Sequence, residues 1–127
     1  MRQRELQLLV FRMDETCYGI DADQVACLQN YDPEQKVLKF HELVGGKSTI
    51  YVTPKMLMVK KRVTYPPVLI NEPEDMICIG SKEIRPVPVL MAHAAHSSGV
   101  WGIVPCKQGM ILLFDFYKNS FFCQPCM

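Results

Sequence analysis

The sequence predicts an all-β protein made of many short strands, and three observations lead to this fold class. Apolar residues recur mainly with a period of two, which is the period of a strand with one buried face. No long stretch shows the period of about 3.6 residues that an amphipathic helix would show, and no segment repeats. Turn signals such as Asp32-Pro33, Gly45-Gly46 and Lys107-Gln108-Gly109 separate the apolar runs at short intervals. Closely spaced short strands of this kind indicate a β-barrel or a β-sandwich.

The first expected element is a β-hairpin followed by one helical turn. Its strands are Leu8–Met13 and Cys17–Ile20, joined by the tight turn Asp14-Glu15-Thr16. Asp21, with Gln24 three residues later, suits the N-cap of a single helical turn. Alternation places on one face of each strand the side chains of Leu9, Phe11 and Met13, and of Tyr18 and Ile20.

The middle of the chain reads as short strands around one further helical turn. Gln29–Lys36 is polar and is expected to be a loop. His41–Val44 is expected to be one helical turn that ends at Gly45-Gly46, because glycine tolerates left-handed backbone geometry. The expected strands are Val25–Leu28, Val37–Phe40, Thr49–Val52, Met56–Lys60, Val68–Ile70 and Met76–Ile79.

The last part of the chain contains the clearest hairpin. After a turn at Gly80–Lys82, Arg85-Pro86-Val87-Pro88 must be extended and cannot lie in the middle of a sheet, because proline fixes φ and lacks an N–H donor. His93–Ser98 has the composition of a loop. The final strands are Val100–Val104 and Met110–Phe116, and Asp115 is expected to close the last strand and turn.

Composition sets limits on the function. The chain has 127 residues, 49% of them apolar, and a formal net charge of +1. This length suits one domain that buries roughly two-thirds of its unfolded surface. The apolar content argues against a disordered chain, and the even charge argues against a general nucleic-acid binder.

The cellular location follows from what the sequence does not show. The N-terminal segment has only a brief apolar run, Leu8–Phe11, too short for a signal peptide, and no stretch approaches the roughly 20 apolar residues of a membrane helix. We therefore expect a cytoplasmic protein without membrane insertion, whose thiols are reduced. Four cysteines in apolar surroundings are expected to fill the core: Cys17, Cys27, Cys78 and Cys106.

Several weak motifs, in the right order, resemble the CheW-like domain. The opening LVFRMDETCYGIDADQVACL resembles that family's "F-R-L-G-x-x-x-Y-x-I-D" hairpin, and VLKFHELVGG resembles its "V-I-D-L-x-x-L-L-G" strand and turn. VLINEPEDMICIGSKEIRPVPV is similar to "G-L-L-V-D-E-V" with a downstream "I-x-P-x-P". The ending GVWGIVPCKQGMILLFDFYK resembles the last hairpin of the family. The resemblance covers Leu8 to Lys118, nearly the whole chain.

The resemblance implies two packed, five-stranded, SH3-like β-barrels in one domain, 6–120, followed by a C-terminal tail, 121–127. The chain departs from the family in its first barrel. Where the family has a longer segment containing "G-L-I-N-L-R-G", only Gln29–Lys36 is present, and Asn71 and Pro73 replace the Asp and the second Val of "V-D-E-V". An incomplete barrel would leave an open edge, at which a second copy could pair to give a homo-oligomer.

The resemblance also implies a function. CheW-like domains are non-enzymatic adaptors that link chemoreceptors to a histidine autokinase of CheA type in chemotaxis-type two-component signalling. The expected partners are therefore proteins, with no cofactor and no catalytic residue. Tyr31, in a polar loop, is the candidate exposed aromatic anchor, although its ring could equally fold back onto the barrel.

Other chemistry remains as an alternative. Cys123 and Cys126 form a C-x-x-C pair that could bind zinc or cycle as a dithiol, with His93 and His96 as further ligands. We interpret the pair as incidental thiols in the tail, and the neighbouring Phe121-Phe122 as packing against the barrel. His41 and Glu42 are neighbours on one helical turn and do not face each other, which disfavours acid–base work. Lys60-Lys61-Arg62 is read as a solvated strand end.

The sequence thus supports an adaptor as its first hypothesis. Two alternatives stay open: a diverged CheW-like module that binds a different partner, and a small β-barrel metal or redox protein that uses the C-terminal C-x-x-C.

Overall fold

Two sheets make up the structure, a computed structural model that describes residues 5–60, 66–88, 98–107 and 109–119. The first sheet has five strands in the order β7-β1-β2-β9-β8, and the second has four in the order β3-β5-β6-β4. The bounds are β1 Glu5–Met13, β2 Thr16–Asp21, β3 Val25–Asn30, β4 Leu38–Lys39, β5 Pro54–Val59, β6 Val68–Asn71, β7 Asp75–Gly80, β8 Val100–Cys106 and β9 Gly109–Phe114.

Helical structure among the described residues is limited to single turns, and none of them is long and apolar enough to cross a membrane. The α-helix α1 spans Phe40–Leu43. The 3-10 turns are η1 Ala22–Gln24, η2 Ser81–Glu83 and η3 Phe116–Lys118.

The five-stranded sheet curls into a barrel. Arg85, just after β7 and η2, exchanges two backbone hydrogen bonds with Ile103 on β8, at 2.7 and 2.9 Å. Because β7 and β8 are the two edges of this sheet, the contact joins one edge to the other. The barrel encloses its own core, here called the barrel core: Leu8, Val10, Ile79, Val104, Ile111 and Leu113. The inward-facing Gly19 is closely packed, since a Cβ there would lie 3.0 Å from the Ile111 side chain, which would have to shift slightly.

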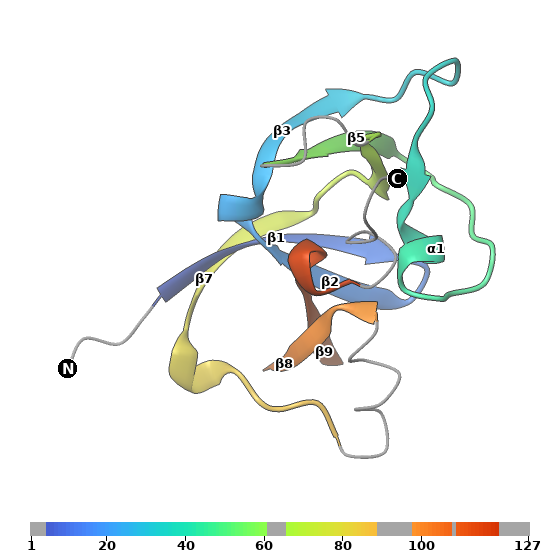
Figure 1. The fold of residues 1–127 in the computed structure, drawn as a ribbon. Helices are drawn as coiled ribbons and strands as arrows, with labels where there is room; N and C mark the ends of the chain where they lie inside the picture. Colours follow the sequence, from blue (N-terminus) through green and yellow to red (C-terminus); the bar gives the residue numbers. More distant parts are fainter. Residues whose placement is uncertain (1–4, 61–65, 89–97, 108, 120–127) are drawn as a thin grey trace.

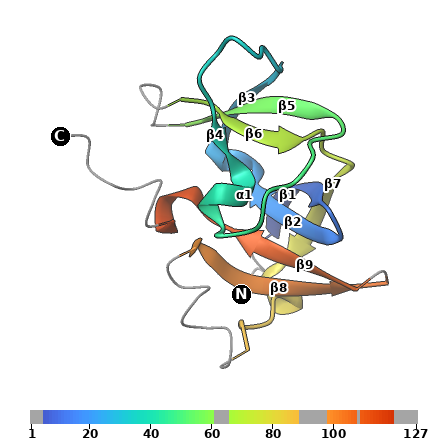
Figure 2. The same cartoon turned by 90° about the vertical axis from the view of Figure 1, so that its right-hand side faces the viewer.

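A second core lies between the barrel and the four-stranded sheet. Figure 1 shows β3 and β5 at one end of the molecule, β8 and β9 at the other, and β1 and β2 crossing between them; Figure 2 shows the same arrangement from the side. This shared core contains Leu9, Phe11, Met13, Ile20, Phe40, Leu43, Leu57, Val59, Val68, Ile70, Phe114 and Phe116. β1 therefore contributes one face to each core, which explains why its residues Leu8–Phe11 are all buried.

Phe40 on α1 is at the centre of the shared core. Its side chain is fully buried, and its ring centroid lies 4.9 Å from Phe11, 4.8 Å from Tyr18 and 4.9 Å from Phe114. All three rings meet it edge to face, the arrangement that aromatic quadrupoles favour. The single turn α1 is thus fixed by packing, and a turn of this length would not persist alone.

The structure confirms the all-β class and several expected elements. The first hairpin pairs Leu9 with Ile20 and Phe11 with Tyr18, and the last hairpin joins β8 to β9. The Asp21 side chain caps η1 by accepting from the Asp23 N–H at 2.9 Å. Asp115 closes the last turn as expected, because its carboxylate accepts the N–H of Tyr117 at 2.8 Å.

Other expectations were wrong in detail. Residues 49–52 form no strand, because no other described strand pairs with them. β3 runs two residues further than expected, to Asn30, where Lys55 of β5 donates to its side chain at 2.6 Å. The second sheet has four strands in the described part of the chain, where the resemblance implied five. The short connection between β3 and β4 contains no strand.

The four cysteines are not core residues. Cys27, Cys78 and Cys106 are exposed and Cys17 is only half-buried, with its side chain against the barrel core. Cys27 is on the outer strand β3, where five of the six residues are exposed, and Cys106 is the last residue of β8, next to the hairpin turn into β9. Apolar neighbours in the sequence did not mean a buried position, because Cys78 alternates with Ile77 and Ile79, which pack in the barrel core, and therefore faces outward.

Candidate protein-binding surface

The residues that the sequence singled out for chemistry mostly lie outside the described part of the chain. This holds for Cys123 and Cys126, for the histidines at 93 and 96, and for the phenylalanines at 121 and 122. Within the described ranges, no group of three or more His, Cys, Asp or Glu side chains could hold a metal ion. The proposed tail, 121–127, falls outside these ranges as well, so the division at residue 120 stays a prediction.

Tyr31 and the basic run give no defined site. Tyr31 follows β3 and its side chain is half-buried, so it remains a prediction as a partner contact. Lys60 follows β5 and is exposed, while residues 61 and 62 lie outside the described ranges.

His41 pairs with a tyrosine rather than with Glu42. Its Nδ1 lies 2.9 Å from the Tyr51 hydroxyl oxygen, which also accepts the backbone N–H of His41 at 3.3 Å. The pKa of Tyr51 is raised, and burial is the main cause. The nearby charges of Glu42 and Asp14 also raise this pKa, while hydrogen bonds to the backbone of His41 and Phe40 partly lower it. Tyr51 also packs against the shared core, so its contacts fix the chain segment that carries it.

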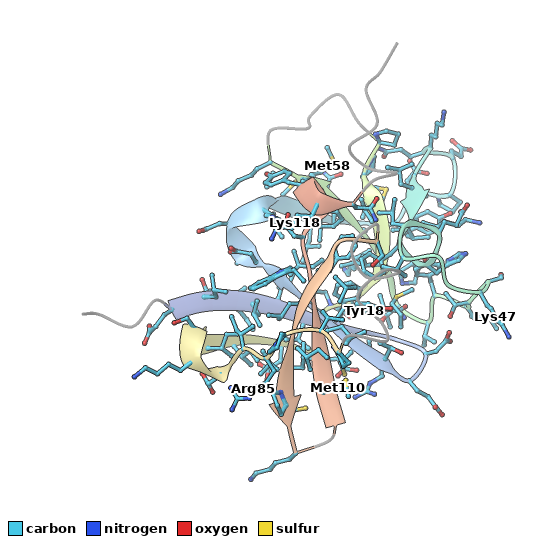
Figure 3. All side chains as sticks on the ribbon, turned by 60° about the horizontal axis from the view of Figure 1, so that its bottom comes forward. Tyr18, Lys47, Met58, Arg85, Met110 and Lys118 are labelled. Atoms are coloured by element: carbon cyan, nitrogen blue, oxygen red, sulfur yellow. The ribbon has the colours of Figure 1, made fainter. Side chains whose placement is uncertain are left out.

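That segment, residues 47–53, is here called the strap. It follows α1 and leads into β5, and Figure 3 shows Lys47, at its start, pointing away from the body of the molecule. Among the described residues, no backbone-to-backbone hydrogen bond involves residues 47–52. Side chains hold the strap instead: Tyr51 bonds to His41, and the Thr49 hydroxyl donates to the Asp14 carboxylate at 2.6 Å.

The strap presents two apolar side chains to solvent. Ile50 is 82% exposed and Val52 is 80% exposed, although the intervening Tyr51 points into the protein. The other exposed large apolar residues of the described chain lie between 37% and 53% exposure. Ile50 and Val52 are therefore the most solvent-exposed large apolar side chains in the described structure.

The surface beside the strap is a shallow hollow of about 440 Å³, whose wall is the β6–β7 connection. Asn71 builds this wall, since its amide donates to the Arg12 carbonyl at 2.9 Å and accepts the Thr53 N–H at 3.3 Å. The Glu72 N–H donates to the Thr53 carbonyl at 2.7 Å, and the Glu74 N–H donates to the carbonyl of a β1 residue at 2.8 Å. An aspartate at position 71 could not donate to a carbonyl, which gives a local reason for the asparagine.

The charges around the hollow are mainly negative. Its lining includes the carboxylates of Asp14, Glu72 and Glu74 and one guanidinium, that of Arg12. The Arg12 guanidinium is paired with Glu74 at 3.3 Å. Three negative groups and one positive group leave a formal charge of −2 at this surface. The strap with its hollow thus combines an apolar pair with an acidic rim, the general composition of a protein contact.

The sequence pattern did not reveal this surface, because the alternation in 49–52 predicted a strand. The alternation was real, with Tyr51 inward and its neighbours outward. A signal for the outward assignment exists in hindsight: the inward position carries the larger, aromatic residue, and Thr53-Pro54 follows directly.

Comparison with known proteins shows the fold. No family model matches the chain, and no curated protein matches it either. Among solved structures, the scaffolding protein TtCheW from Thermoanaerobacter tengcongensis aligns with a TM-score of 0.68 over 96% of this chain and 94% of that one. The chain has the CheW-like fold. The sequences are only 16% identical, so the likeness to TtCheW concerns the fold.

The CheW-like fold confirms the resemblance that the sequence motifs carried. It also agrees with the arrangement of two sheets, with one core inside the barrel and a second core shared between the sheets.

Proposed function

We propose that this chain is a non-enzymatic adaptor that works in the cytoplasm and couples a chemoreceptor to a histidine autokinase of CheA type. The observation that carries the proposal is the likeness in fold to a scaffolding protein over nearly the full length of both chains. A scaffold acts by presenting surfaces to two partners, so its function needs rigid elements and exposed anchors. The strap, with its exposed Ile50 and Val52, is consistent with such a role.

A binding experiment tests the proposal. The purified chain would be titrated by calorimetry with the cytoplasmic domain of a chemoreceptor and, separately, with the kinase from the same genome. We expect saturable binding to each protein and a ternary complex in sedimentation velocity. Failure to bind either protein at 100 μM, which corresponds to a binding free energy of only about −5.5 kcal/mol, would contradict the proposal.

A second candidate is a CheW-like module that binds a different partner. The specific feature in its favour is the connection between β3 and β4, which is short and carries no additional strand. Because β3 has only β5 as a described neighbour, its outer edge differs from that of a sheet with a further strand beside it. In the titrations above, this candidate predicts that the folded chain binds neither the chemoreceptor nor the kinase.

A further inference from the structure

We propose that the strap surface, formed by Ile50, Val52 and Pro73, docks one partner protein through a segment that carries two apolar side chains flanked by Lys or Arg. This inference deepens the proposed function, on which it rests, by naming the contact and the chemistry of the partner. Three properties of this surface support the inference: the exposure of Ile50 and Val52, the side-chain bonds that hold the strap, and the negative charge around the hollow.

The exposure of Ile50 and Val52 indicates a surface that a partner protein covers. Two β-branched apolar side chains at about 80% exposure, one residue apart, are hydrated on nearly every side. Ile50 and Val52 both line the hollow, together with Pro73, so an apolar group placed there would meet three apolar side chains at once. Removing such surface from water is the main favourable term in association.

Hydrogen bonds within the chain hold the strap in place without a bound partner. Thr49 is bonded to Asp14 on one side of Ile50, and Tyr51 is bonded to His41 on the other side. At the far end, Thr53 is bonded to Asn71 and to the backbone of Glu72. A preorganised segment loses little conformational entropy on binding, so a contact made by two side chains can still be effective.

The negative charges around the hollow favour a partner segment that carries Lys or Arg. With Arg12 paired to Glu74, the carboxylates of Asp14 and Glu72 leave the rim negative. A flanking Lys or Arg on the partner would complement this rim and would speed association. A second copy bound face to face through the same surface would place these carboxylates against their own counterparts. Like charges across an interface are unfavourable, so the surface fits a basic partner better than itself.

The test compares three variants in the titrations with receptor and kinase described above. The double variant Ile50→Ser with Val52→Ser removes the apolar pair, and Glu72→Gln removes one rim charge. Met110→Ser is the matched control, because Met110 is an exposed apolar residue, at 53%, that lies on the barrel and does not line the hollow. Far-ultraviolet circular dichroism verifies that each variant folds.

We expect the double variant to weaken binding of one partner by roughly 30- to 300-fold, as loss of two anchors does. Glu72→Gln should weaken the same binding by about 3-fold and reduce its dependence on salt, and Met110→Ser should leave the affinity unchanged. Wild-type binding that the double variant retains would overturn the docking site and leave the proposed adaptor function standing. Absence of wild-type binding to both proteins would overturn both. A wild-type dimer that the double variant dissociates would assign the surface to self-association and overturn the proposed occupant.

Discussion

Replacing Phe40 by alanine tests how the two sheets are held together. The Phe40 side chain is fully buried and meets three aromatic rings at centroid distances of 4.8 to 4.9 Å. Truncation removes the transfer free energy of the ring and leaves a cavity, and such changes cost about 3–5 kcal/mol in protein cores. A domain of this size has about 5–15 kcal/mol of stability, so the free energy of unfolding should fall by roughly a fifth or more. We expect the melting temperature to fall by about 15 °C.

The control variant is Phe40→Leu, which keeps most of the apolar volume and loses the three edge-to-face contacts. We expect it to cost about 1–2 kcal/mol. Both variants would be unfolded in urea while far-ultraviolet circular dichroism and the fluorescence of Trp101 are recorded. Trp101 is the only tryptophan and packs against the barrel core, so it reports on the core to which Phe40 does not belong.

The two signals decide whether the cores unfold together. We expect the circular dichroism and fluorescence midpoints to shift by the same amount, because β1 belongs to both cores. A loss below about 1 kcal/mol for Phe40→Ala would refute the assigned packing. A shift of the dichroism midpoint with no change in fluorescence would refute the coupling between the two cores.

Three further predictions address smaller features. Asn71→Asp should lower the free energy of unfolding by about 1–3 kcal/mol at pH 7, measured in urea, since a carboxylate would face the Arg12 carbonyl in place of an N–H donor; an unchanged stability would contradict that hydrogen bond. Burial raises the pKa of Tyr18, so the folded chain should hold this proton at a pH where the unfolded chain releases it. Stability should then fall as the pH rises above about 10, and less steeply in Tyr18→Phe, when melting temperatures are compared from pH 9 to 11; equal slopes would contradict the burial. In the native protein, alkylation followed by peptide mass spectrometry should modify Cys17 more slowly than the exposed thiols of Cys27, Cys78 and Cys106; equal rates at all four positions would contradict the assigned exposure.

The elements that could be predicted are those whose local pattern has one physical solution. The first hairpin combines a two-residue period with a tight turn, and Asp21 meets the requirement of an N-cap. The helical turn of α1 ends near Gly45, which has a φ of 73° that favours glycine. These features need only neighbours in the sequence, so the sequence alone locates them.

The features that could not be predicted depend on distant partners. The strap alternates like a strand, but a strand also needs a neighbour, and none of the described segments supplies one. Cys27 has apolar neighbours in the sequence, yet it lies on an outer strand with exposed side chains. The anchoring of the strap by His41 and Asp14 joins residues 10 and 35 positions apart, which no local pattern reveals.

The parallel pairing of β2 with β9 has a consequence for the order of folding during synthesis. The first hairpin is at the centre of the five-stranded sheet, but its neighbour β9 ends at Phe114, near the end of the chain. While the ribosome makes the intervening residues, the β2 edge of the hairpin has no strand to pair with. Both apolar faces of the hairpin remain exposed until the residues that cover them have been made. Pairings so distant in sequence form slowly and leave such edges open to association with other chains. We therefore expect the nascent chain, far more than the finished protein, to depend on chaperones.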